Sequence, residues 1–598
     1  LRRAEPSPPP ARTIRSPAAK GAVNDLGIVD WRRRAYWIAL AFVPSSLMLG
    51  VTQHVSTDVA AVPLLWIIPL LIYLLSFVSA FSKRARVSTR ILGRLLPIGL
   101  LTLIYMFLAG SRSPVLVIAG SHLAVFAVVA LLAHTRLADD RPDATSLTQF
   151  YLWMSVGGVL GGVFNALLAP LLFDFVLEYP IMLAAACLLT PRAAAELGER
   201  TTTPQAVRLT RLGLIVLAAV AAAASLYLAE VSITSTWIDR AVGGSDSPAF
   251  LYLSAFMRAG LPTLVAAGAL LGNGSLRFAT VTLILAVGSP FVGLGGQVRE
   301  VERTFFGVHR VTTNADGTLN VLHHGTTLHG LQLRPWPERP QDANRIDPET
   351  RNRLFWGNRM LFSPERRAEL VYLLPTSYYY PTGPIGDVMG MLTTQDRLKE
   401  IAVIGMGTGS LAAYSRPGSR FTMIEIDPAV KRIAETPDYF SFIADSAGAI
   451  DIRVGDGRLV MGDFSDRAFD LIVVDAFSSD AIPVHLLTKE AVEMYLSKLS
   501  DRGVLAFHTS NRYFDLSPVL ARAASEIGAV AFERNDNAYP KAEAAEFKKD
   551  STWVVLCRDT EHFQPLATLP NWKRLQVRPG DPLWTDDYSN LMDVFVGW

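Results

Sequence analysis

Long apolar runs separated by short polar stretches fill the first half of the chain. Most runs approach the roughly 20 residues that a helix needs to cross about 30 Å of hydrocarbon. The charged faces that the helices of a large soluble core would need are absent between them. The pattern therefore predicts a transmembrane helical domain of about eight or nine helices over residues 35–295. The runs lie at 36–53, 61–82, 91–109, 114–133, 149–172, 174–190, 209–229, 250–271 and 276–295.

Residues 1–34 precede the first run and are rich in Pro, Ala and Arg without any periodicity. This composition is typical of a disordered tail. The chain begins at Leu1 rather than Met and shows no signal peptide, so we expect a processed or truncated N terminus.

Basic residues in the loops set the expected orientation in the membrane. They gather before the first run and after the second, fourth and sixth runs, which predicts a cytoplasmic N terminus. Nine crossings would place the C-terminal part outside the cell, so we expect an even number, with the soluble part cytoplasmic and the bundle in the cell inner membrane. The sixth and ninth runs, which contain Glu178 and Pro290, are the weakest helix predictions.

From about residue 303 the pattern changes to short apolar stretches. Segments 304–311 and 318–324 flank a turn at 314–317 that favours positive φ, which predicts a β-hairpin, with a third strand at 328–333. These elements and a connecting loop form a predicted small β subdomain over residues 303–380. Beyond it, strands alternate with helical segments, which predicts a parallel, doubly wound Rossmann-like sheet over 381–598. The expected strands are 400–405, 420–427, 450–454, 469–475, 502–508 and 552–558.

Composition agrees with this division. Half of the 598 residues are hydrophobic and the mean hydropathy is +0.28, which is too apolar for an ordinary soluble protein of this size. A formal net charge of +2 gives no nucleic-acid footprint. Two isolated cysteines form neither a disulfide framework nor a metal cluster. His323, His324 and His329 have no Cys or acid at ligand spacing, so we expect no metal.

A glycine-rich turn follows the strand predicted at 400–405. Gly405, Gly407 and Gly409 let the backbone approach a ligand and turn into a helix whose N–H groups point at it. Glu425 ends the next strand, where an acid can accept both ribose hydroxyls. Asp456 ends the third strand, where a carboxylate can accept from an adenine amino group. The spacing predicts a nucleoside pocket; acids that merely cap helices at strand ends are the alternative.

Asp475 ends the fourth predicted strand and faces the same crevice, with Asp480 just beyond it. A carboxylate there can orient and deprotonate an amine for attack on the carbon beside a sulfonium. Proximity and in-line alignment would then do most of the work. The alternative is a loop carboxylate that caps the helix near Leu486.

Four soluble stretches together resemble the spermidine synthase family, the polyamine aminopropyltransferases. The hairpin and the Tyr-rich segment after it resemble the small β domain of that family and its junction with the Rossmann-like domain. The membrane part resembles bacterial proteins in which such a domain is fused to a multi-helix membrane region. The stretches that carry the resemblance are 405–410, 425–427, 454–457 and 474–480, with 44–51 and 58–66 in the membrane part.

The resemblance implies that Glu425 binds the ribose, Asp456 binds the adenine and Asp475 is the catalytic base. Tyr379, Tyr380 and Asp480 are expected to hold the substrate amine, the tyrosines by cation–π contact, with packing between the subdomains as their alternative role. The full cofactor-binding set is Gly405, Gly407, Thr408, Gly409, Glu425, Asp456 and Gly457.

Thr408 departs from the family, which has an aspartate there that engages the aminopropyl nitrogen of decarboxylated S-adenosylmethionine. We expect a membrane-anchored, spermidine synthase-like transferase of polyamine biosynthesis that moves an aminopropyl group from this co-substrate to an amine. A methyltransferase that uses S-adenosylmethionine itself is one alternative. A non-catalytic polyamine- or nucleoside-binding sensor or transporter is another. The expected partners are a small-molecule amine, the lipid bilayer and a second copy in a homodimer through the soluble domain, without nucleic acid.

Overall fold

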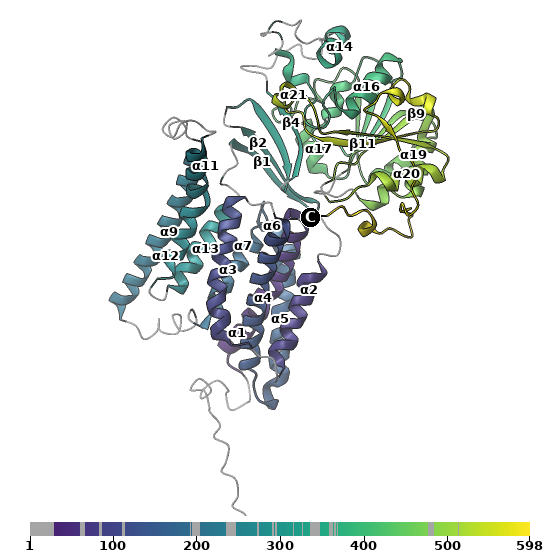
Figure 1. Ribbon diagram of the computed structural model, residues 1–598. Coiled ribbons are helices and arrows are strands. Elements are labelled where there is room, and N and C mark those ends of the chain that lie inside the picture. Colours follow the sequence, from purple (N-terminus) through teal and green to yellow (C-terminus); the bar gives the residue numbers. More distant parts are fainter. Residues whose placement is uncertain are drawn as a thin grey trace, which may run out of the picture.

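A computed structural model describes the chain from Val29 to Gly597, apart from internal segments (Figure 1). Most of the predicted tail, 1–28, therefore lies outside the described residues. Its last residues do not match the prediction, because helix α1 (Trp31–Gln53) already begins at Trp31. Arg33 and Trp37 in its first turns donate to the Asp140 carboxylate at 3.0 and 2.7 Å, which fixes this end of α1. The internal segments outside the description are 60–65, 83–86, 111–113, 192, 194–203, 235–246, 272–273, 290–291, 293–295, 315, 326, 335–346, 358–362, 364–365, 367–368, 477–482 and 512.

Apolar helices form a bundle in the first half of the molecule (Figure 1). Over the described residues, each of the nine predicted runs contains a helix. Six helical stretches are long and apolar enough to cross a membrane by length and composition, namely Trp31–Ser56, Thr89–Ala109, Val115–Asp139, Ala144–Leu172, Gln205–Glu230 and Pro248–Ala269. The other three are shorter, namely Ile67–Phe81, Glu178–Leu188 and Ser275–Gly288. The described helices are α1, α2 (Ile67–Phe81), α3 (Thr89–Ala109), α4 (Val115–Asp139), α5 (Leu147–Val163), α6 (Ala169–Leu172), α7 (Glu178–Leu188), α9 (Gln205–Thr234), α11 (Pro248–Ala255), α12 (Leu261–Ala269) and α13 (Ser275–Gly288).

Small residues let α1 and α5 approach closely. A Cβ added to Gly157 would lie 2.4 Å from the carbonyl oxygen of Ile38, and one added to Gly161 would lie 2.8 Å from that of Phe42. Ser45 also donates to the carbonyl of Gly158 at 2.9 Å. Close backbone contact of this kind is how small residues join apolar helices.

An antiparallel sheet of four strands follows the bundle, in the order β1 (Gly296–Thr304), β2 (Gly307–Asn314), β3 (Leu319–His324) and β4 (Thr327–Leu333). The predicted hairpin and third strand correspond to β2, β3 and β4. The prediction missed β1 because its sequence is charged rather than apolar. The first residues of the strand predicted at 304–311 instead form the β1–β2 turn.

The large sheet has the order β12-β10-β11-β9-β8-β5-β6-β7. The five strands from β9 to β7 are parallel, as predicted, but β9–β11, β11–β10 and β10–β12 pair antiparallel. The prediction of a wholly parallel sheet is therefore wrong at this edge. The connection from β10 to β11 contains only the short α21 (Lys541–Ala545) and does not cross the sheet. The strands are β5 (Glu400–Ile404), β6 (Arg420–Glu425), β7 (Ala449–Val454), β8 (Phe469–Val474), β9 (Leu499–His508), β10 (Val530–Asp536), β11 (Ser551–Cys557) and β12 (Lys573–Arg574).

Helices cover both faces of this sheet, so its central strands are buried on both sides. In β5, Ile401 and Val403 join one hydrophobic core, while Ala402 and Ile404 join the other. A continuous apolar strand is the sequence signature of this arrangement. The helices of this part are α14 (Pro348–Trp356), α16 (Pro384–Thr394), α17 (Pro428–Glu435), α18 (Gly457–Gly462), α19 (Lys489–Lys498) and α20 (Ser517–Glu526).

A buried ion pair joins the small sheet to the bundle. Arg303 of β1 contacts Glu178 of α7 with both terminal nitrogens, at 2.7 and 3.1 Å. It also donates to the carbonyl of Phe175 at 3.0 Å. The two charged side chains are only 6% and 0% exposed, so neither is available to solvent. Glu178, which weakened the helix prediction, thus has a defined partner.

Candidate active site

A cavity of about 220 Å³ opens at the carboxyl ends of the parallel strands. The strand order reverses between β5 and β8, and such a switch point is where open α/β sheets bind ligands. The cavity is also lined by residues of the small sheet. Seven predicted site residues line it, namely Tyr379, Gly405, Gly407, Glu425, Asp456, Gly457 and Asp475.

The glycine-rich loop after β5 packs against its neighbours so closely that side chains are excluded. Gly405 has φ +90°, and an added Cβ would lie 2.2 Å from the carbonyl oxygen of Asp475. Gly407 has φ +53°, and its Cβ would lie 2.9 Å from the carbonyl oxygen of His329. Only glycine fits at these two positions, and the backbone of both lines the cavity.

Glu425 is anchored by the loop that it faces. One carboxylate oxygen accepts the N–H of Met406 at 3.0 Å, and the other accepts that of Asp427 at 3.1 Å. Burial raises the pKa of Glu425 above its ordinary value, while the two N–H groups act in the opposite direction. Each oxygen keeps a lone pair for a further donor, such as a ribose hydroxyl.

Asp456 has two roles, one for each oxygen. Its Oδ1 caps α18 by accepting the N–H groups of Arg458 and Leu459, both at 3.0 Å. Its Oδ2 lies 3.1 Å from Nε2 of His485, which also lines the cavity. The capping alternative therefore holds for one oxygen, while the other belongs to the cavity.

Asp586 of the C-terminal segment holds the part of the site around Asp456 in place. Arg458 donates to both oxygens of Asp586 at 2.6 Å, and Thr488 donates to Oδ1 at 2.8 Å. The hydrogen bond from Arg458 is the largest influence that lowers the pKa of Asp586 below its ordinary value. The segment thus holds the helix that Asp456 caps.

Asp475 lies deep in the site and is held on both oxygens. Tyr379 donates its hydroxyl to Oδ2, and Nδ1 of His508 lies 2.7 Å from Oδ1. The alternative that Asp475 caps the helix near Leu486 is wrong, because the short helix Val484–Leu486 has Pro483 at its N-cap and no side-chain cap.

Tyr380 differs from its neighbour Tyr379. It is fully buried, does not line the cavity, and donates its hydroxyl to Glu546. The predicted contact of Tyr380 with the amine therefore does not fit the structure, whereas its alternative role in packing does.

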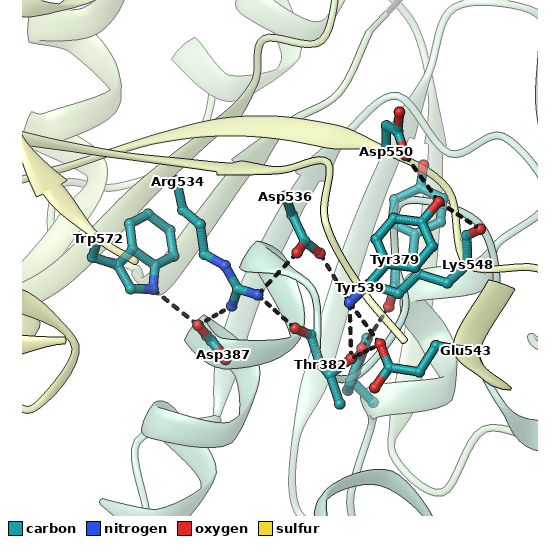
Figure 2. A network of polar contacts seen from close by, with 11 residues as sticks. Tyr379, Thr382, Asp387, Arg534, Asp536, Tyr539, Glu543, Lys548, Asp550 and Trp572 are labelled. Carbon is teal, nitrogen blue, oxygen red and sulfur yellow. Dashed lines mark hydrogen bonds and ion pairs between the residues drawn. The ribbon is translucent and has the colours of Figure 1, made fainter. Parts of the chain in front are cut away.

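A network of polar contacts lies next to this tyrosine segment (Figure 2). Lys548 reaches Thr382, Glu543 and Asp536 at 3.0, 2.9 and 3.0 Å. Arg534 joins the network by pairing with Asp387 and Asp536. These contacts fix the chain that follows Tyr379.

Thr408 and Gly409, like Tyr380, do not line the described cavity. Thr408 is fully buried, contacts Ser410 Oγ at 2.8 Å, and packs against β4, where a Cβ on Gly330 would lie 2.4 Å from its hydroxyl. Gly409 follows in the same loop and does not line the cavity. Asp480 lies in 477–482, outside the described residues.

Sequence reasoning considered His324 and His329 only as metal ligands and missed that imidazole groups line the cavity. His309, His324 and His329 of the small sheet line the cavity, and together they are named the histidine wall. His309 Nε2 lies 2.7 Å from Oδ2 of Asp427, which also accepts the Thr304 hydroxyl at 2.5 Å. Burial opposes ionisation of Asp427, but these hydrogen bonds outweigh it and lower its pKa. Burial, then the neighbouring imidazoles, lowers the pKa of His329 to about 3.

One signal could have revealed His508, because it ends an apolar strand beside Asp475, as the predicted acids do. No comparable signal pairs His309 with Asp427, which lie 118 positions apart. Within the described residues, no group of three or more His, Cys, Asp or Glu side chains is arranged to hold a metal ion.

A five-stranded parallel core, a glycine loop at the switch point and acids at the strand ends define a Rossmann-like domain. No protein-family model matches the chain. A polyamine aminopropyltransferase of Vibrio vulnificus is 34% identical over 123 residues, which are 19% of this chain and 40% of that protein. A probable polyamine aminopropyl transferase of Bifidobacterium longum is 29% identical over 133 residues, which are 22% and 27% of the two chains. About a fifth of this chain is therefore similar to polyamine aminopropyltransferases, and the predicted resemblance of the soluble part is confirmed at that coverage.

The chain spans 27–40% of the length of these curated relatives. An eEF1A lysine and N-terminal methyltransferase of Xenopus laevis is 24% identical over 205 residues, which are 32% of this chain and 27% of that protein. Among solved structures, a probable spermidine synthase of Corynebacterium glutamicum has a TM-score of 0.31 at 15% identity and covers 50% of this chain and 98% of its own. Spermidine synthase of Thermotoga maritima has a TM-score of 0.28 at 15% identity, with 47% and 81% covered.

Proposed function

We propose that this protein is a membrane-anchored, spermidine synthase-like transferase that moves an aminopropyl group from decarboxylated S-adenosylmethionine to an amine. The observation that supports it best is the single cavity onto which the glycine loop, Glu425, Asp456 and Asp475 all face. A glycine backbone and acids at successive strand ends suit a nucleoside, and a further carboxylate at the crevice suits a nucleophile that must lose a proton.

In the proposed reaction, Glu425 accepts the ribose hydroxyls and Asp456 accepts the adenine amino group. Asp475 takes a proton from the acceptor amine, whose nitrogen attacks the carbon beside the sulfonium. The carbon–sulfur bond breaks with its electron pair on sulfur, and methylthioadenosine leaves. The sulfonium already activates this carbon, so alignment of the two substrates supplies most of the rate.

A methyltransferase that uses S-adenosylmethionine itself is the second candidate. Thr408 favours it, because the buried hydroxyl at this loop position offers no counter-charge to an aminopropyl cation. The two reactions leave different nucleosides: methylthioadenosine after aminopropyl transfer, and S-adenosylhomocysteine after methyl transfer.

The test uses the purified full-length chain in detergent. Calorimetry with S-adenosylmethionine, its decarboxylated form and methylthioadenosine measures which nucleosides bind. Incubation of each donor with small diamines, followed by mass spectrometry, then identifies the product. Methylthioadenosine supports the first proposal and S-adenosylhomocysteine the second, whereas tight binding without product supports a sensor. Light scattering of the same sample tests the proposed homodimer.

We further propose that the bundle lies in the inner membrane with the soluble domain in the cytoplasm, where adenosyl substrates are supplied. The six long apolar helices support the embedding. Both native cysteines are buried, so one cysteine introduced at Lys399, which is 59% exposed, can report the side. An impermeant maleimide should label it only after spheroplasts are lysed. Labelling of intact spheroplasts would contradict the cytoplasmic placement.

A further inference from the structure

The Asp475 carboxylate has partners that are fixed before any substrate arrives. Tyr379 donates to Oδ2, and His508 Nδ1 lies 2.7 Å from Oδ1. The Asp475 and His508 side chains are only 1% and 5% exposed. An ionised carboxylate can only accept hydrogen bonds, so the proton between Asp475 and His508 lies on Nδ1.

The other ring nitrogen of His508 continues this chain of hydrogen bonds. Nε2 lies 2.7 Å from Oγ of Ser510, and that oxygen already accepts the N–H of Thr552 at 2.8 Å. The hydroxyl proton of Ser510 is therefore directed at Nε2, which is unprotonated in this state. The order of donors is Ser510 to His508 to Asp475.

Two aromatic rings hold the imidazole in place. Tyr378 stacks on it at a centroid distance of 4.3 Å and 25°, and Trp553 stacks on it at 4.8 Å and 23°. The ring is thus held by stacking and by a hydrogen bond at each nitrogen. A side chain fixed by so many contacts is pre-organised for one orientation of its partner.

We infer that His508 is a positioning residue that orients the Asp475 carboxylate for proton removal, an inference that rests on the proposed function. The acceptor N–H bond breaks and its proton passes to Asp475, the new carbon–nitrogen bond forms, and the carbon–sulfur bond breaks with its electrons on sulfur. The negative charge of Asp475 and the positive charge of the sulfonium are thus both neutralised. His508 keeps its proton on Nδ1 throughout, while Nε2 accepts from Ser510.

The tyrosines beside the Asp475–His508 pair keep their hydroxyl protons. Tyr378 stacks on the imidazole, and Tyr379 donates to the other carboxylate oxygen of Asp475. Burial first, and then Asp475, raises the pKa of both tyrosines above their ordinary range. The Tyr379 hydroxyl therefore remains a donor that helps His508 to fix the carboxylate.

Two variants of the protein in detergent test the positioning role. His508→Ala removes the N–H donor, and we expect kcat to fall about 50-fold with the donor KM changed less than about twofold. His508→Asn keeps an N–H donor for Asp475. It should recover most of the orientation, with kcat within about fivefold of wild type. His562→Asn is the matched control, since His562 does not line the cavity.

A kcat in His508→Ala equal to that of wild type would overturn the inference and leave the proposed function standing. A wild type that binds no adenosyl nucleoside would instead overturn the proposed function. Nitrogen-15 NMR of histidine-labelled full-length protein then tests the pair without turnover, with His508→Asn assigning the signal. At pH 8 we expect the Nδ1–H tautomer, and an Nε2–H tautomer would contradict the assigned hydrogen-bond order.

Discussion

Two parts of the cavity lining use different chemistry. The strand ends of the large sheet supply backbone N–H groups and the acids Glu425, Asp456 and Asp475, here named the acid floor. The small sheet supplies the histidine wall, and His309 joins wall to floor through Asp427. Acids at strand ends are typical of nucleoside sites, whereas the wall offers weakly basic groups that carry no fixed charge. The comparison suggests that the floor performs binding and chemistry, and that the wall keeps the floor in shape.

The largest expected effect comes from replacing Asp475, the proposed catalytic base in the acid floor. Asp475→Asn should lower kcat by about 100-fold or more, because it loses the proton acceptor but keeps its shape. Affinity for methylthioadenosine should stay within a few fold, as calorimetry would measure. Asp470→Asn, at the other end of the same strand, is the control. Unchanged turnover in Asp475→Asn would end the catalytic assignment.

A second floor variant should affect binding rather than turnover. Glu425→Gln removes the charge that we expect to meet the ribose hydroxyls, and affinity for methylthioadenosine should fall about 50-fold. Titration calorimetry of the full-length chain measures this loss. Glu435→Gln, at the exposed end of α17, should leave affinity unchanged. Equal affinity in the two variants would show that the floor does not hold the sugar.

The contact between wall and floor can be broken at Asp427. Asp427→Asn should lower the free energy of unfolding by about 2 kcal/mol at pH 7. The pKa of Asp427 is lowered in the folded state, so its stabilisation is complete above the unfolded value of about 3.9 and is lost as pH falls through the folded value. The unfolding temperatures of the two proteins should therefore begin to approach each other below about pH 4 and meet only below the folded pKa of Asp427. Asp438→Asn, an exposed carboxylate, is the control, and a constant difference at all pH values would contradict the assignment.

The smallest expected effect distinguishes two adjacent tyrosines. Tyr379→Phe removes the hydroxyl that Asp475 accepts, and kcat should fall about fivefold. Tyr380→Phe removes the contact with Glu546 away from the cavity, so its kcat should stay within about twofold of wild type. Steady-state kinetics on both variants make the test. A larger loss of kcat in Tyr380→Phe than in Tyr379→Phe would indicate that Tyr380 belongs to the active site.

The acid floor was largely predictable from the sequence because its information is local. Each strand is an apolar run, and each candidate acid or glycine ends its strand, as Glu425 does, or follows it directly, as Gly405 and Asp475 do. Parallel strands bring such ends to one edge, so spacing along the chain was enough to bring the residues together.

The wall was not predictable, for a physical reason. The contact between His309 and Asp427 depends on how the two sheets pack against each other, and no short segment of the sequence determines that packing. The same holds for Thr408, whose hydroxyl faces Gly330 of β4 rather than the cavity. Strand β1 was missed because its alternating Arg and Glu side chains resemble a polar loop.

Neighbouring residues of β1 tie a bundle helix to the nucleoside crevice. Arg303 forms an ion pair with Glu178 of α7. The Thr304 hydroxyl donates to Asp427, whose own N–H donates to Glu425. Successive side chains of a strand point to opposite faces, so one short piece of backbone carries both attachments. A displacement of α7 must therefore either break the bidentate ion pair with Arg303 or pull on β1 and, through Thr304 and Asp427, on Glu425.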